Sequence, residues 1–100
     1  MKIKINRNFG SQLLTAMRRC GYSSPRNSGG EQNFTRRLGS LDYPHFHVYV
    51  NEAGEQGTVL SLHLDQKKPS YGQHTAHSGD YDTAGVEREA ARIKYVLDNI

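Results

Sequence analysis

The stretch PHFHVYV, residues 44–50, decides the fold. Its side chains alternate between apolar and polar, which is the period of a strand whose two faces meet different surroundings. One face consists of Phe46, Val48 and Val50. The other face consists of His45, His47 and Tyr49. We therefore expect a strand in an antiparallel sheet that is covered by helices on one side only.

Two neighbouring stretches predict partner strands for residues 45–50. In TVLSLHLD, residues 58–65, the leucines Leu60, Leu62 and Leu64 alternate with Val59, Ser61, His63 and Asp65. The polar, glycine-containing segment 51–57 between the two stretches is typical of a hairpin loop. In NFTRRL, residues 33–38, a weaker alternation sets Phe34, Arg36 and Leu38 against Thr35 and Arg37. These patterns predict a meander of three strands.

Two amphipathic helices are expected at the ends of the chain. The first runs from about Ser11 to Cys20, with Ser11 as N-cap and Gly21 as the terminating glycine. Its apolar face is formed by Leu13, Ala16, Met17 and Cys20. The second begins near Asp82 or Thr83, either of which would cap it. Its apolar stripe is formed by Val86, Ala90, Ile93 and Leu97, with Val96 and Ile100 beside it.

The expected architecture is α+β with the order α-β-β-β-α. It has a three-stranded antiparallel sheet with both helices on one face, in a single domain spanning residues 1–100. The alternation of Ile3 and Ile5 with Lys2 and Lys4 fits a short edge strand or an ordered lead-in, and four residues do not decide between them.

The composition restricts function only weakly. Thirteen Lys and Arg against ten Asp and Glu give a net charge of +3, which permits an anionic partner without requiring one. The single cysteine, Cys20, excludes an intrachain disulfide and is expected to be buried. No apolar run has the length of a signal peptide core or a membrane span, so we expect a cytoplasmic protein with no membrane partner. No cofactor is expected.

The polar face of the expected sheet is the candidate site. Arg37, His45, His47, Tyr49 and His63 would gather there, with His47 adjacent to His63 across two strands. A guanidinium binds phosphate, an imidazole transfers protons at neutral pH, and a tyrosine stacks on a base. Two other interpretations stay open. The face could simply be solvated, or the paired histidines could bind a transition metal, although no diagnostic metal motif is present.

The segment 66–82 is long, polar and without periodicity, which is typical of a functional or disordered loop. It contains His74 and His77 near Asp80 and Asp82, and the pair Lys67 and Lys68 that would add positive charge beside the site.

The chain resembles the HicA-type mRNA interferase toxins in the order of its elements. That order is helix, strand, Gly39-Ser40, histidine-bearing strand, strand, histidine loop and helix. That family has a small double-stranded-RNA-binding-domain-like α-β-β-β-α fold, and a histidine that follows a Gly-Ser pair catalyses RNA cleavage. The end of the long loop, HSGDYDTAGV, is similar to the family's histidine loop and last helix, with His77 in the matching place. This sequence departs from the pattern because LDYP, residues 41–44, separates Gly39-Ser40 from the histidines.

The resemblance implies an RNA-binding protein with endoribonuclease activity and a partner antitoxin. His47 would be the general acid or base with His45 beside it, and His63 and His77 would assist. Arg37, Lys67 and Lys68 would hold phosphate and Tyr49 would meet a base. The alternatives are a non-enzymatic interaction module and a histidine metal-binding domain.

Overall fold

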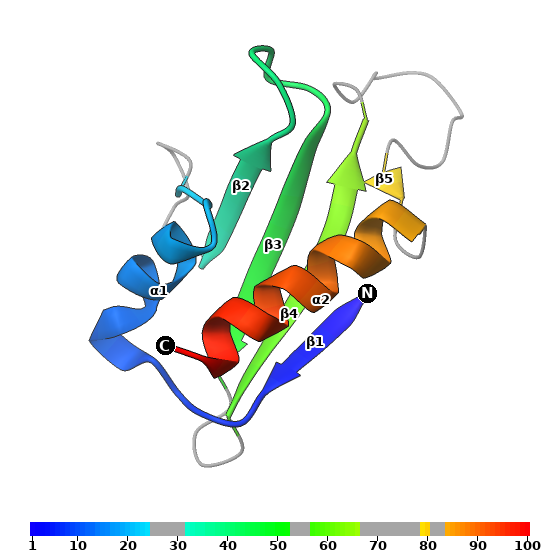
Figure 1. Ribbon diagram of the computed structural model, residues 1–100. Coiled ribbons are helices and arrows are strands. Elements are labelled where there is room, and N and C mark those ends of the chain that lie inside the picture. Colours follow the sequence, from blue (N-terminus) through cyan, green and yellow to red (C-terminus); the bar gives the residue numbers. More distant parts are fainter. Residues whose placement is uncertain (25–31, 53–56, 67–78, 81–83) are drawn as a thin grey trace.

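The computed structural model describes residues 1–24, 32–52, 57–66, 79–80 and 84–100 (Figure 1). Along the chain the strands are β1 (Lys2–Ile5), β2 (Asn33–Arg37), β3 (His45–Glu52), β4 (Thr58–Asp65) and β5 (Gly79–Asp80). The helices are a short 3-10 turn (Gly10–Gln12), α1 (Leu13–Arg19) and α2 (Ala84–Asp98). The α+β class is confirmed.

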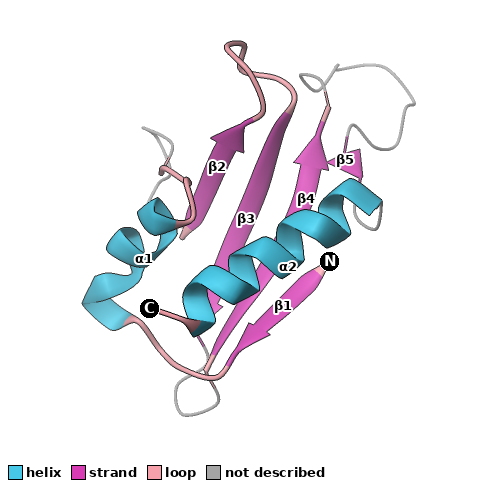
Figure 2. Ribbon diagram, in the orientation of Figure 1, coloured by secondary structure: helices cyan, strands magenta, loops and turns pink. Residues whose placement is uncertain are grey.

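The sheet is antiparallel with the strand order β1-β4-β3-β2 (Figure 2), and β5 also pairs with β4. The prediction of three strands is therefore wrong in detail. The segment left open at the start of the chain is strand β1, which pairs from Lys2↔Ser61 to Ile5↔Thr58. Four residues are too few for a period of two to be distinguished from chance, but pairing with β4 supplies the backbone partners that define a strand.

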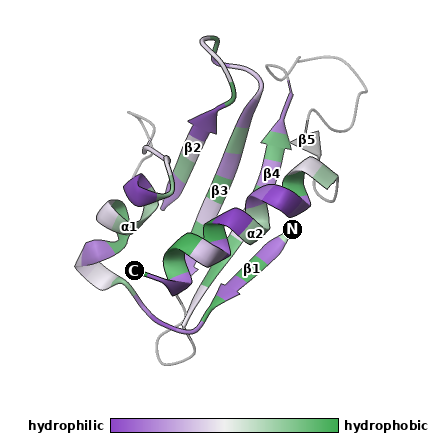
Figure 3. Ribbon diagram, in the orientation of Figure 1, coloured by the Kyte–Doolittle hydropathy of each residue, from purple (hydrophilic) through white to green (hydrophobic). Residues whose placement is uncertain are grey.

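The apolar face of the sheet is buried beneath both helices (Figure 3). Val48, Leu60 and Leu62 are at most 1% exposed, as are Val86, Ile93 and Leu97 of α2. Ile3 and Ile5 extend this face onto β1. Burying the apolar side of β3 and β4 in this way leaves the histidine-bearing side uncovered by either helix, as the alternation predicted.

The two ends of α1 differ from each other in how well the sequence predicted them. Gly21 follows the helix with φ of +89°, which confirms it as the terminating glycine. Ser11 is not the N-cap, because it lies inside the 3-10 turn, and Gln12 takes the cap position without a side-chain hydrogen bond. The turn is closed instead by the Gln12 amide, which donates to the Phe9 carbonyl at 2.8 Å. The expected caps of α2, Asp82 and Thr83, lie outside the described residues.

Candidate functional site

An open basin of about 620 Å³ lies on the face of the sheet opposite the two helices. It is lined by Thr35, Arg37, Asp42, Tyr43, His45, His47, Tyr49, His63 and Asp65. The strand register accounts for this assembly, since Arg37 stands opposite His45 and His47 stands opposite His63. The predicted adjacency of His47 and His63 is confirmed, with ring centroids 4.9 Å apart.

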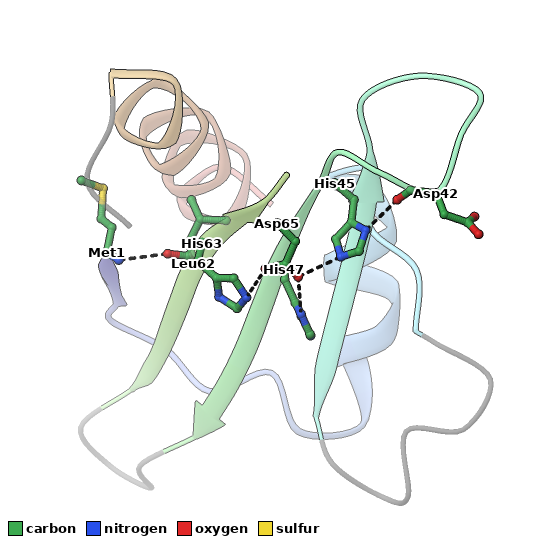
Figure 4. A network of polar contacts seen from close by, with 7 residues as sticks. All are labelled: Met1, Asp42, His45, His47, Leu62, His63 and Asp65. Carbon is green, nitrogen blue, oxygen red and sulfur yellow. Dashed lines mark hydrogen bonds and ion pairs between the residues drawn. The ribbon is translucent and has the colours of Figure 1, made fainter. Parts of the chain in front are cut away.

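The carboxylate of Asp65 is the centre of the histidine cluster, which we define as His45, His47, His63 and Asp65 (Figure 4). Asp65 Oδ2 lies 3.0 Å from His45 Nε2 and 3.4 Å from His47 Nδ1. Asp65 Oδ1 lies 3.1 Å from His63 Nε2. Three imidazoles from two strands therefore converge on one carboxylate. Sequence analysis placed Asp65 on the polar face but did not give it this central role.

The second nitrogen of His45 determines how that ring meets Asp65. His45 Nδ1 lies 2.7 Å from the carbonyl oxygen of Asp42, which only accepts hydrogen bonds, so Nδ1 carries a hydrogen and donates. A neutral His45 would then present a bare Nε2 to the carboxylate oxygen of Asp65 at 3.0 Å. Two acceptors at this distance repel each other. A positive species between them, either a proton or a metal ion, turns the contact into an attraction.

His47 and His63 are held in their neutral forms by their surroundings. Burial lowers the pKa of His47, and the positive form of His63 beside it lowers it further, against the opposing pull of Asp65. Burial likewise lowers the pKa of His63 and outweighs the attraction of Asp65. The lowered pKa values favour the uncharged form of both rings at neutral pH, in which one ring nitrogen keeps a lone pair. His47 Nε2 is buried and has no hydrogen-bond partner among the described residues.

The flat rings in the basin form a continuous series. Tyr43 and His45 have centroids 4.6 Å apart, and His47 and Tyr49 stack at 4.4 Å. Tyr49 also lies over His63 at 5.7 Å, and 45% of its surface is exposed. Tyr43 was not predicted as a site residue. Extending the alternation of residues 45–50 back by two positions places it on the face of His45, which is the signal that would have found it.

Positive side chains stand at both edges of this face. Arg37 on β2 is 58% exposed in its side chain and lies 3.5 Å from Asp42 Oδ1 at the rim. On β1, Lys2 and Lys4 are exposed and alternate with the buried Ile3 and Ile5, so they project on the polar side. The two lysines were not predicted as site residues because residues 2–5 were not assigned to the sheet.

The structure thus brings together five of the predicted site residues: Arg37, His45, His47, Tyr49 and His63. The other three, Lys67, Lys68 and His77, lie outside the described residues, and so does His74.

Comparison with known proteins found no match for this chain among protein families, curated protein sequences or solved structures. Within the described residues, no helix combines the length and the apolar character that crossing a membrane requires.

Proposed function

We propose that this protein binds single-stranded RNA in the basin on the open face of its sheet. The observation that carries the proposal is the series of rings from Tyr43 to Tyr49 inside a hollow lined with polar groups, in which Tyr43, His45 and His47 are partly buried and Tyr49 is exposed. Unpaired bases stack on such rings, whereas the bases of a duplex are already stacked on each other. Four-stranded antiparallel sheets with aromatic residues on the open face are a recurrent platform for two or three bases.

The charges at the two edges of the sheet support the same proposal. Arg37 on β2 and Lys2 on β1 are separated by three strand spacings, about 14 Å, across the sheet and by four residues, about 13 Å, along the strands. Phosphates of a strand that crosses the sheet would meet cations at both ends of its path, while its bases lie over the rings between them. Binding through phosphates releases counterions, so its strength falls as salt rises.

The experiment is a fluorescence titration of the protein with a labelled single-stranded RNA and with the corresponding duplex, each at several salt concentrations. The proposal predicts tighter binding of the single strand and an affinity that decreases with salt. The Tyr49→Ala variant should lose about 1–3 kcal/mol, the contribution of one stacked base. Tyr95→Ala is the matched control, because Tyr95 is 72% exposed on α2. Equal affinities of the two variants would contradict stacking on the sheet.

A second pair of variants separates the phosphate contact from general charge. Arg37→Gln should weaken binding and reduce the salt dependence by about one counterion. Arg19→Gln, an exposed arginine at the end of α1, removes the same charge away from the basin and should leave both unchanged. If the wild-type protein binds neither RNA at low salt, the proposal fails and the non-enzymatic protein interaction module becomes the better interpretation.

The resemblance to HicA-type toxins adds two points to the proposal. The protein would cleave the bound strand, and it would have a partner antitoxin. The histidine cluster lies in the basin, so a strand bound there brings its phosphates within reach of imidazoles held by a carboxylate. Loss of RNA cleavage in the His45→Ala and His47→Ala proteins, with RNA binding retained, would support it. Unchanged cleavage in both variants would rule out this cluster as the catalytic centre.

A further inference from the structure

We propose that His45, His47 and Asp65 form a binding site for a divalent transition-metal ion, with zinc as the ion of best fit. This inference does not rest on RNA binding and goes beyond it. The ligand atoms are His45 Nε2, His47 Nδ1 and Asp65 Oδ2, from the adjacent strands β3 and β4. The three residues each offer one ligand atom, and these atoms lie within 4.8 Å of one another.

The distances within this group match those around an ion. Ligand atoms about 2.0–2.2 Å from zinc in a tetrahedron are separated by about 3.4 Å, and in an octahedron by about 3.0 Å. Asp65 Oδ2 lies 3.0 Å from His45 Nε2 and 3.4 Å from His47 Nδ1. The third separation, between His45 Nε2 and His47 Nδ1, is within 4.8 Å, and a bound ion would bring these two nitrogens to about 3.4 Å or less. Three protein ligands leave a further coordination position open toward the basin, as in catalytic zinc sites.

The hydrogen bonds around two of the ligands, His45 and Asp65, orient them for an ion. A metal-binding histidine usually donates its second N–H to a carbonyl or carboxylate, and His45 Nδ1 donates to the Asp42 carbonyl at 2.7 Å. That bond leaves Nε2 of neutral His45 directed at Asp65 without a hydrogen between them. On the other side of the carboxylate, Oδ1 lies 3.1 Å from His63 Nε2, so His63 can hold Asp65 in place while Oδ2 binds the ion. An ion thus satisfies the contact that a neutral His45 leaves repulsive.

The donor set selects the class of ion. Two imidazole nitrogens and one carboxylate suit zinc and other late transition metals. Magnesium and calcium prefer oxygen ligands, so they are not expected to compete. In the proposed RNA complex, the open position would face the phosphates, where a metal acts as a Lewis acid or supplies a bound hydroxide. Cleavage would then require the ion, and a chelator would abolish it.

The test measures zinc binding directly, without RNA, by calorimetry on protein purified without a histidine tag and stripped with a chelator. The wild-type protein should bind zinc and should retain its affinity in excess magnesium. Asp65→Asn should weaken zinc binding more than about 100-fold, and His63→Ala, which removes a supporting contact, about 10–100-fold. Asp98→Asn is the matched control. It makes the same charge change on α2, away from the basin, so its affinity should be unchanged.

A second measurement covers the case in which a variant is poorly folded. In nitrogen-15 spectra of wild-type histidine side chains, zinc should shift Nε2 of His45 and Nδ1 of His47. The proposal is overturned if wild-type protein binds no zinc, if Asp65→Asn and Asp98→Asn bind it equally, or if the shifts occur on other histidines. RNA binding in the presence of a chelator is measured separately, so the two proposals fail independently.

Discussion

Tyr22 and Glu89 are 67 positions apart in the sequence, yet the Tyr22 hydroxyl donates a 2.6 Å hydrogen bond to Glu89 Oε2. The two residues are 1% and 5% exposed. Arg92 holds the same carboxylate through two contacts of 2.8 Å and also donates to the Cys20 carbonyl at 2.6 Å. This buried group connects the end of α1 to α2 on the covered side of the sheet, so it supports the fold that presents the basin.

The Tyr22→Phe variant should be less stable than the wild type. It removes a buried hydrogen bond to a charged group, for which the expected loss is about 1.5–3 kcal/mol in the free energy of unfolding. Tyr95→Phe removes a hydroxyl from a tyrosine that is 72% exposed and should change stability by less than about 0.5 kcal/mol. Urea denaturation followed by circular dichroism measures both. Indistinguishable midpoints would show that the Tyr22 hydroxyl contributes nothing net.

The stability of the protein should fall in acid through Glu89. Burial alone would raise the pKa of this carboxyl, but hydrogen bonds from Arg92 and Tyr22, with the charges of Arg92 and Arg36, outweigh burial and hold the pKa below its ordinary value of 4.5. The folded state therefore releases this proton more readily than the unfolded chain does. The contribution is fully present above the ordinary value and is lost as the pH falls through the lower folded pKa.

Glu89→Gln tests this pH dependence. The difference in unfolding free energy between wild type and Glu89→Gln should be large near neutrality and should shrink as the carboxyl of the folded wild type becomes protonated. Glu87→Gln, on the exposed side of the first turn of α2, should give no such convergence. A difference that stays constant down to strongly acidic pH would show that Glu89 does not stabilise the fold through its charge.

The parts of the fold that sequence could predict are those set by local alternation. The apolar and polar sides of β3 and β4 follow from a period of two, and His47 faces His63 as the alternation suggested. Strand β1 was not decided, because its four residues are defined by pairing with β4. Pairing is a long-range property that a local pattern does not contain.

The site was only partly predictable for a similar reason. The histidines were found because they repeat on one strand face, but Asp65 as their common partner depends on the exact register His45↔Asp65. Glu89 was not found from the sequence at all. A carboxylate in the first turns of a helix is ordinarily an exposed partner of the helix dipole, whereas that of Glu89 is buried against Tyr22. A charged residue next to an apolar stripe does not reveal that a partner from a distant part of the chain, here Tyr22, is buried beside it.

Cys20 should be nearly unreactive in the folded protein. It is 1% exposed, and burial, partly offset by Arg92, raises the pKa of its thiol from 9.0 to about 11. At mildly alkaline pH the reactive thiolate is therefore about a hundredfold scarcer than in an unfolded chain. Mass spectrometry after timed iodoacetamide treatment should show slow alkylation in native buffer and rapid alkylation in urea. Equal rates in the two conditions would mean that the C-terminal end of α1 opens readily around Cys20.

Gly57 should not tolerate a side chain, because it lies where β1 and β4 approach each other. Its φ is +98°, and a Cβ on it would collide with the carbonyl oxygen of Ile5. Gly57→Ala should lower the unfolding free energy by at least about 1–3 kcal/mol through backbone strain alone, before the collision is included.

Gly39→Ala is the matched control for Gly57→Ala, since a Cβ on Gly39 meets no described atom within 4 Å. Because the collision is with Ile5, Gly57→Ala should also speed hydrogen exchange of the β1 amides more than that of the β2–β3 pair. Loss of β1 would remove the edge that carries Lys2 and Lys4, so RNA affinity should fall along with β1 protection. A Gly57→Ala protein that is as stable as Gly39→Ala, with unchanged exchange in β1, would contradict the close approach of the two strands.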